Sequence, residues 1–190
     1  MGKGRLEAFS DGVIAIIITI MVLELKQPGG HSLEALSQVA HHIGIYVLSF
    51  FYAGIYWNNH HHLFQAVKSV NGAALWSNLH LLFWLSLTPF TSAWMGESHF
   101  APLPVAVYGA ALLMCGVAYT ILVRTLIAHN GRDSLLARAI GNDAKGWASL
   151  GMYAAGIGAA AFLPLLSVGL YAAVAAMWLI PDRRIERVIH

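Results

Sequence analysis

The sequence predicts an all-α integral membrane protein, a single domain of six transmembrane helices over residues 1–190. Of its residues 58% are hydrophobic and only 11% are charged, and the mean hydropathy is +0.64. A water-soluble domain of this length needs a charged surface, which this composition does not supply. The expected surroundings are therefore a lipid bilayer, and no nucleic-acid partner is expected.

Six apolar segments have close to the roughly 20 residues that cross a hydrocarbon layer about 30 Å thick. Pro28-Gly29-Gly30 follows the first segment, Asn71-Gly72 opens the third, and Pro102 begins the fourth, where a missing N–H costs nothing. Pro164 favours a turn over a kink, because one helix over 147–180 would be too long for a single crossing. The predicted spans are 5–26, 34–64, 72–96, 103–127, 146–163 and 165–181.

Basic residues lie almost entirely on one side of this six-span arrangement, and Lys26 is the exception. The positive-inside rule then places both termini in the cytoplasm, and the bias supports an even number of spans. The run from Asp182 to Arg187 is expected to anchor the C-terminus at the membrane surface. The basic residues on the cytoplasmic side are Lys3, Arg5, Lys68, Arg124, Arg132, Arg138, Lys145, Arg183, Arg184 and Arg187.

A carboxylate, Asp11, lies inside the first predicted span. A charge near the bilayer centre costs roughly 2.5–3.5 kcal/mol on insertion scales, so this acid needs partners. The second span brings Trp57-Asn58-Asn59-His60-His61-His62 to the same depth, and the third brings Asn78 and His80. We expect a buried hydrogen-bond network that fixes the first helix against its neighbours. For His60 to His62, a position among lipid headgroups is an equally good interpretation.

A histidine-rich metal site is the alternative use of these side chains. Ligands on one helix face need histidines at i and i+3 or i+4, and the chain contains no such pair. The HExxH, GxSxG, Walker A and GxGxxG motifs are also missing from the sequence. We therefore expect no enzyme activity, no cofactor and no bound metal other than a permeant ion. The histidines considered are His41, His42, His60, His61, His62, His80 and His99.

On a helical wheel the first predicted span shows two opposite stripes. Asp11, Ile14, Ile18, Val22 and Leu25 form one of them. Because nearly every position is apolar, the periodicity does not decide which stripe faces lipid. A TVGYG-type filter does not occur, which excludes the carbonyl-ring type of potassium filter. The other stripe comprises Phe9, Gly12, Ile16, Thr19, Ile20, Leu23 and Gln27.

The start of the first span resembles a known family. Arg5, Phe9, Ser10 and Asp11 match the RxxxFSD signature of the endolysosomal potassium channel transmembrane protein 175 and its prokaryotic relatives. The segments 57–61 and 85–90 resemble the second- and third-helix motifs of the prokaryotic proteins. The resemblance covers essentially the whole chain and is clearest in its first half.

This resemblance implies a potassium-selective channel of the cell membrane, here a prokaryotic inner membrane, that forms a homotetramer around a central pore. The first helix would line the pore, with a hydrophobic constriction at Ile16, Ile20 and Leu23 and the Thr19 hydroxyl nearby. Apolar rings narrow a pore and gate it by dewetting. Asp11 and Ser10 would then support the helix from behind. The expected structural network comprises Arg5, Phe9, Ser10, Asp11, Trp57, Asn58, His61, Asn78 and His80.

A proton- or cation-coupled secondary transporter is the alternative function. In it, Asp11 and buried histidines would form a relay that titrates during turnover. Against it, the sequence lacks two similar halves, and Pro89 is the main interruption within a span. An adaptor without transport activity is a third interpretation.

Overall fold

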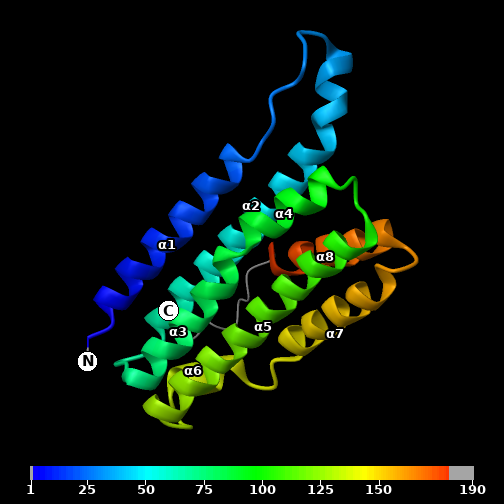
Figure 1. The fold of residues 1–190 in the computed structure, drawn as a ribbon. Coiled ribbons are helices and arrows are strands. Elements are labelled where there is room, and N and C mark those ends of the chain that lie inside the picture. Colours follow the sequence, from blue (N-terminus) through cyan, green and yellow to red (C-terminus); the bar gives the residue numbers. More distant parts are fainter. Residues whose placement is uncertain (1, 180–190) are drawn as a thin grey trace.

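The computed structural model describes residues 2–179, and this part of the chain is built of α helices (Figure 1). The predicted all-α fold class is confirmed for these residues. The C-terminal anchor at 182–187 and the end of the sixth predicted span lie outside them. The helices are α1 (Gly4–Leu23), α2 (Leu33–Gln65), α3 (Gly72–Ser86), α4 (Thr88–Glu97), α5 (Pro102–Asn130), α6 (Leu135–Ile140), α7 (Ala144–Ala159) and α8 (Pro164–Leu179).

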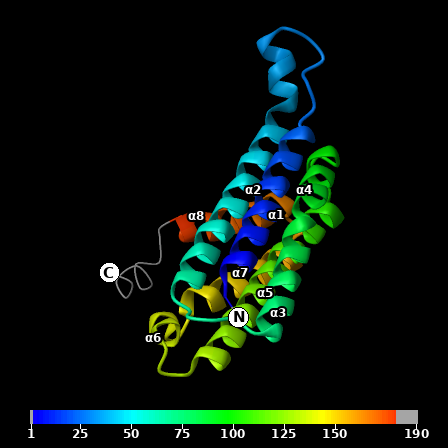
Figure 2. The same cartoon turned by 90° about the vertical axis from the view of Figure 1, so that its left-hand side faces the viewer.

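The N-terminus, the end of α2 and the end of α5 meet at one end of an elongated bundle (Figures 1 and 2). The Lys3 ammonium donates to the backbone carbonyl of Phe64 near the C-terminus of α2. The backbone N–H of Lys68 donates to Asn130 Oδ1 at the last residue of α5, at 3.2 Å. A cation at a helix C-terminus satisfies free carbonyls and complements the helix dipole.

The segment after α1 and the end of α4 meet at the opposite end of the bundle. Lys26 Nζ lies 2.8 Å from Glu97 Oε1, and both side chains are exposed. The connections on either side of α2 thus lie at opposite ends, as expected for a helix that runs back along α1 (Figure 2).

The predicted single helix over 72–96 is two helices, α3 and α4, that meet at Leu87. Pro89 has no N–H, so it cannot donate to the carbonyl of Leu85, four residues earlier. The Thr88 hydroxyl takes that place and donates to the Leu85 carbonyl at 2.6 Å. The proline therefore breaks the helix, while a neighbouring side chain keeps the carbonyl paired.

The turn predicted at Pro164 is confirmed, because α7 ends at Ala159 and α8 begins at Pro164. Each of these helices has 16 residues, about 24 Å of rise. Among the described residues, α1, α2 and α5 are long and apolar enough to cross a membrane, and α8 is a shorter apolar helix. The sequence did not predict α6, a short helix whose first turn is capped by the Ser134 hydroxyl.

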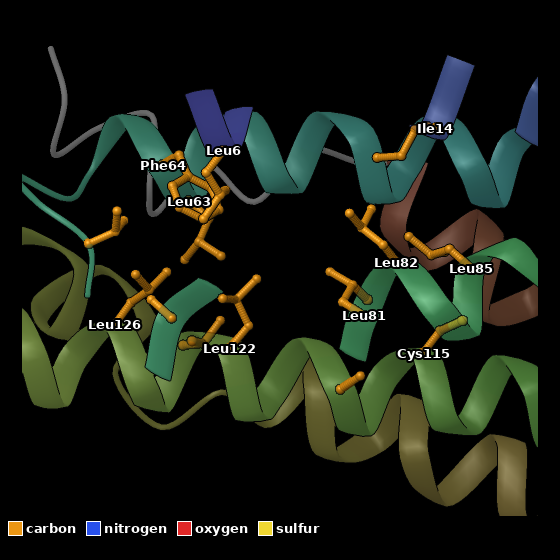
Figure 3. Packing of buried hydrophobic residues seen from close by; sticks show 14 of the residues in the cluster. Leu6, Ile14, Leu63, Phe64, Leu81, Leu82, Leu85, Cys115, Leu122 and Leu126 are labelled. Carbon is orange, nitrogen blue, oxygen red and sulfur yellow. The ribbon is translucent and has the colours of Figure 1, made fainter. Parts of the chain in front are cut away.

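One half of the core joins α1, α2, α3 and α5 (Figure 3). The leucines Leu63, Leu81, Leu122 and Leu126 in it are fully buried, and so is Cys115. Within a membrane lipid tails are as apolar as leucine, so close van der Waals packing rather than transfer from water holds such a core together.

The other half of the core is built around tyrosines of α2, α5, α7 and α8. The Tyr52 hydroxyl donates to the backbone carbonyl of Tyr171 at 2.6 Å, and the hydroxyls of Ser49 and Tyr108 lie 3.0 Å apart. Polar atoms in hydrocarbon need an internal partner, and these contacts supply one. Gly156 of α7 lets the helix approach the Tyr171 ring directly.

We expect Gly156→Ala to lower the stability of the bundle. A Cβ at this position would lie 2.5 Å from Tyr171 Cε1, so a buried ring must shift. Overpacking of this kind costs about 1–3 kcal/mol. Thermal unfolding in detergent micelles measures the change.

Gly158→Ala is the matched control two residues along α7, because no atom lies within 4 Å of a Cβ there. Alanine gains up to about 1 kcal/mol of helix propensity over glycine, so this variant should unfold at or above the wild-type temperature. Equal unfolding temperatures for the two variants would contradict the assigned contact.

Candidate functional site: the first helix and its polar supports

The helix α1 presents one narrow stripe to the bundle. Leu6, Ser10, Ile14, Ile17 and Met21 are buried, at spacings of three and four residues. This spacing places them on one face of an α helix. The remaining circumference of α1 contacts less of the chain and is free for lipid, a second subunit or a pore.

The predicted constriction residues lie on the exposed side of α1. Ile16 is 58% exposed, Ile20 41% and Leu23 81%. The Thr19 hydroxyl donates to the Ile16 carbonyl at 2.8 Å. Large apolar side chains left uncovered in such a row are typical of a surface that contacts lipid or another protein.

The opposite stripe of the predicted wheel is displaced in the structure. Ile14 of that stripe is buried, but Val22 is 45% exposed, and the other buried positions, Ile17 and Met21, belong to neither predicted stripe. A wheel of uniformly apolar residues does not mark the core-facing side, which contacts with α2, α3 and α4 decide.

A buried polar chain links α1, α2 and α3. Asn78 Nδ2 donates to Ser10 Oγ at 2.9 Å, and His60 Nε2 lies 2.8 Å from Asn78 Oδ1. Ser10 in turn donates to the Leu6 carbonyl at 2.8 Å. Since an amide oxygen only accepts, His60 Nε2 carries the proton in this arrangement. The side chains of Ser10, His60 and Asn78 are almost completely buried.

The contribution of these buried hydrogen bonds to stability depends on their surroundings. A hydrogen bond between membrane helices contributes about 0.6 kcal/mol on average and up to about 1.7 kcal/mol. Losing the central amide leaves His60 Nε2 without its acceptor and Ser10 Oγ with only its bond to the Leu6 carbonyl, and an unsatisfied buried group costs more than the bond itself contributes. Asn78 is the central residue, because it contacts both Ser10 on α1 and His60 on α2.

Asp11 has a different partner and a different environment. The Trp57 indole N–H of α2 donates to Asp11 Oδ1 at 3.0 Å, and both residues are exposed in the single chain. The Trp57 ring also stacks on His61, with centroids 6.2 Å apart and planes inclined by 16°. Asp11 therefore ties the flank of α1 to α2 and does not enter the buried chain.

His61 and His80, two further residues of the predicted network, bond within their own helices. His61 Nε2 lies 2.8 Å from Gln65 Nε2, and the Trp84 indole N–H donates to His80 Nε2 at 2.9 Å. His61 is linked to Asp11 through its stacking on Trp57, whose indole donates to the carboxylate.

Arg5, Phe9 and Asn58 complete the predicted network. Arg5 and Phe9 are exposed on α1, and Phe9 lies on the same side as Ile16. Asn58 is half-buried, and its side chain makes no hydrogen bond within residues 2–179. His60, the residue that links α2 to Asn78, was left out of the predicted network set. Its burial matches the stripe of Ala53, Leu63 and Phe64 on α2, and that periodicity could have singled it out.

An open groove runs along α1 beside α4. Apolar side chains of both helices line it, and the carboxylates of Glu24 and Glu97 lie at its end. The hydrogen bond and charge of the Lys26 ammonium hold the pKa of Glu97 below its usual range. Within residues 2–179 no group of three or more His, Cys, Asp or Glu side chains is placed to bind a metal ion.

Long apolar helices joined by buried hydrogen bonds define a helical membrane protein. The family model described as endosomal/lysosomal potassium channel TMEM175 matches residues 5–89. A potassium channel of a Chryseobacterium species is 56% identical over 187 residues, which are 98% of this chain and 97% of that protein. The chain belongs to the TMEM175 family, as the RxxxFSD resemblance implied.

Two further comparisons extend this result. A potassium channel of Streptomyces collinus is 36% identical over 131 residues, 63% of this chain and 62% of that protein. The crystal structure of a lysosomal potassium-selective channel TMEM175 homologue from Chamaesiphon minutus aligns with 95% of this chain, and the alignment includes 97% of the homologue's chain. Its TM-score is 0.83 at 27% identity. The fold therefore extends beyond the segment that the family model matches.

We expect Asn78→Ala to destabilise the protein by about 1–3 kcal/mol, because His60 Nε2 and Ser10 Oγ lose their shared partner in a buried site. The measurement is thermal unfolding in micelles, together with the yield of folded protein. Asn142→Ala, in the exposed loop before α7, is the control and should leave both quantities unchanged. If Asn78→Ala unfolded at the wild-type temperature, the buried hydrogen bonds of Ser10, Asn78 and His60 would not be a support of α1.

Proposed function

We propose that this protein is a potassium-selective channel whose pore lies on the axis of a homotetramer and is lined by the exposed face of α1. The potassium-channel class follows from the family and from relatives that carry this name. The observation that supports the pore assignment is the row of large apolar side chains that α1 leaves uncovered, above all Ile16 and Leu23.

The chemistry of this face fits a hydrophobic constriction. Around a symmetry axis, Ile16, Ile20 and Leu23 would form successive apolar rings, which block ions when the space between them dewets. The Thr19 hydroxyl donates its proton to the Ile16 carbonyl, so its oxygen lone pairs stay free for a cation. Hydroxyl and carbonyl oxygens replace part of a potassium ion's hydration shell.

The polar supports suit a helix that lines a pore. Ser10 holds α1 to α3 through Asn78, and Asp11 holds it to α2 through Trp57. The two bonds lie on neighbouring residues and involve different helices, so they fix the rotation of α1 about its own axis. Rotation determines which side chains face the pore, and a support that fixes it keeps Ile16 and Ile20 in place.

The homotetramer, the six spans and the cytoplasmic termini belong to the same proposal. The apolar groove between α1 and α4 supports the oligomer, because Ile16, Ile20, Phe90 and Trp94 line it and no element within residues 2–179 covers it. The short helices α7 and α8 complete the six spans if α3 and α4 cross as one unit. We further propose a single-domain, multi-pass protein of the cell membrane that needs no cofactor.

The contacts do not favour the secondary transporter. Its relay needs Asp11 to exchange protons with a buried histidine. In the structure Asp11 accepts from the Trp57 indole, and the buried His60 bonds to the amide of Asn78. Neither the indole nor the amide passes a proton between these groups.

Purified protein in planar bilayers tests the channel. We expect stepwise single-channel currents that carry many ions per opening and reverse near the potassium equilibrium potential. A channel passes ions through a continuous pore and therefore gives ohmic steps. Saturable flux without steps, dependent on a proton gradient, would overturn the proposal in favour of a transporter.

We expect Ile16→Asn and Leu23→Asn to raise the current and to lower the preference for potassium over sodium. A polar ring keeps water in the constriction and lowers the barrier to ions. A barrier lower by about 1.4 kcal/mol gives about a tenfold larger current. Conductance and reversal potential in mixed potassium and sodium solutions measure both effects.

Val22→Asn is the control for these two variants. Val22 is adjacent to Leu23 on α1 and equally apolar, but lies outside the stripe of Ile16 and Ile20. Wild-type conductance and selectivity in Ile16→Asn and Leu23→Asn, or an equal effect of Val22→Asn, would show that the pore stripe is assigned incorrectly.

A further inference from the structure

A cavity lies between α2, α5, α7 and α8, and a residue of α6 closes one side of it (Figure 1). Its volume is about 60 Å³. One water needs about 10–15 Å³ of such space, so the cavity has room for roughly four to six waters. A single small organic ring that extends into the open mouth needs a similar space.

Aromatic rings form much of the cavity wall. Those of Tyr56 and Tyr119 meet edge to face, with centroids 6.1 Å apart and planes inclined by 68°. Trp178 also lines the cavity, and its indole N–H donates to Ser149 Oγ at 2.8 Å. Aromatic rings pack well against another ring, in offset or edge-to-face contact. A flat aromatic body therefore suits this wall.

Two polar side chains of the wall lack hydrogen bonds that their neighbours have. Tyr56 and Asn59 lie three residues apart on α2, which places them on one face of the helix. Asn59 Nδ2 donates to the Ile55 carbonyl at 2.8 Å, but neither Asn59 Oδ1 nor the Tyr56 hydroxyl is hydrogen-bonded within residues 2–179.

The surroundings of Tyr56 make this lack of partners costly. Tyr56 lies among Tyr52, Cys115 and Tyr119, yet it is not fully buried, and it lines the cavity. Polar groups inside a membrane protein need a partner from the protein, from water or from a ligand. The Tyr56 hydroxyl and Asn59 Oδ1 thus mark where the contents of the cavity form hydrogen bonds.

The chemistry of these two groups selects among ligands. A tyrosine hydroxyl donates and accepts, whereas an amide oxygen only accepts. One ligand hydroxyl can therefore donate to Asn59 Oδ1 and accept from Tyr56. A carboxylate could not donate to Asn59, and it would be repelled by Asp143, which also lines the cavity. Any ion would lose its hydration in a largely apolar site, so an uncharged ligand fits best.

Gly116 of α5 provides part of the space. A Cβ at this position would lie 2.9 Å from Leu150 Cδ2, 3.8 Å from Tyr153 Cε2 and 3.9 Å from the Tyr56 hydroxyl oxygen. An added methyl group would thus lie beside the unpaired hydroxyl. The tight contact is with the far end of the flexible Leu150 side chain, which can move. Alanine is also a better helix former than glycine, so this position can be filled without breaking α5.

We propose that this cavity binds a small, uncharged aromatic alcohol of the phenol type. The ring of the ligand packs against the tyrosine rings and Trp178, and its hydroxyl bonds to Tyr56 and Asn59. The site is separate from the exposed face of α1, so it goes beyond the proposed channel function and does not depend on it. Ordered water is the alternative content of the cavity.

Fluorine NMR of 4-fluorophenol with the full chain in lipid nanodiscs tests the site. Partition into lipid rises linearly with concentration and also occurs in empty nanodiscs, whereas a binding site saturates. We expect saturable binding of one molecule per chain with a Kd of about 0.1–1 mM, as is usual for so small a ligand. Uptake equal to that of empty nanodiscs would show that the cavity holds water and would overturn the proposal.

Tyr56→Phe removes the unpaired hydroxyl and keeps the ring. It should weaken the binding of 4-fluorophenol by about threefold to tenfold, the effect of one hydrogen bond, and leave the unfolding temperature unchanged. Fluorobenzene has no hydroxyl, so it should bind the wild type more weakly and should not respond to this variant. Tyr46→Phe, on α2 but outside the cavity, is the control and should bind both probes like the wild type.

Gly116→Ala narrows the cavity and should weaken the binding of both probes by about tenfold. Gly151→Ala, at a position of α7 where no atom lies within 4 Å of a Cβ, is its control. Unchanged binding in Gly116→Ala, or an equal loss in Gly151→Ala, would overturn the assigned site. An equal loss of both probes in Tyr56→Phe would contradict the role of the hydroxyl. These measurements need no ion current, so their outcome is independent of the proposed channel.

Discussion

The absence of water in a bilayer is the constraint on which the rest of this structure depends. Each polar side chain within a span needs a partner from the same protein, and each partner found fixes one helix against another. The bond from Asn78 to Ser10 joins α3 to α1, and the bond from His60 to Asn78 joins α2 to α3. The break between α3 and α4 obeys the same constraint, because Thr88 satisfies the Leu85 carbonyl that Pro89 leaves free.

The signature at the start of α1 combines two kinds of support. Ser10 faces the core and Asp11 the flank, since adjacent residues on a helix point about 100° apart. The smaller, uncharged side chain is the one that is buried, and the carboxylate stays exposed on the flank of α1. This placement avoids the cost of a buried charge and still engages the Trp57 indole.

Sequence patterns predicted the helices of this fold better than they predicted the side-chain contacts between the helices. Proline and glycine positions located the connection after α1, the start of α5 and the turn between α7 and α8, because these residues act on the backbone locally. The helices α1 and α7 end three and four residues earlier than the predicted spans, at Leu23 and Ala159. The gathering of Ser10, Asn78 and His60 also follows from depth along antiparallel helices. The pairing of Asp11 with Trp57, and of His80 with Trp84, depends on helix rotation, which a uniformly apolar wheel does not encode. The break at Leu87 could have been predicted from Pro89.

The supports of α1 are unequal along its length, and this inequality bears on how such a helix would move. Near the N-terminus α1 is held by a buried chain through Ser10, by the Asp11–Trp57 bond and by Lys3 on the carbonyls that end α2. Just beyond Leu23, within residues 2–179, the side-chain contact is one exposed ion pair, beside the imidazoles of His41 and His42, which have no hydrogen-bond partner in that part of the chain. Buried and paired groups resist displacement, while exposed pairs exchange readily with water and other charges. A helix fixed at one end tilts most at the other, so motion of α1 would concentrate at Ile20 and Leu23. A constriction that gates by dewetting needs only a small change in radius there, because water leaves an apolar ring abruptly as it narrows.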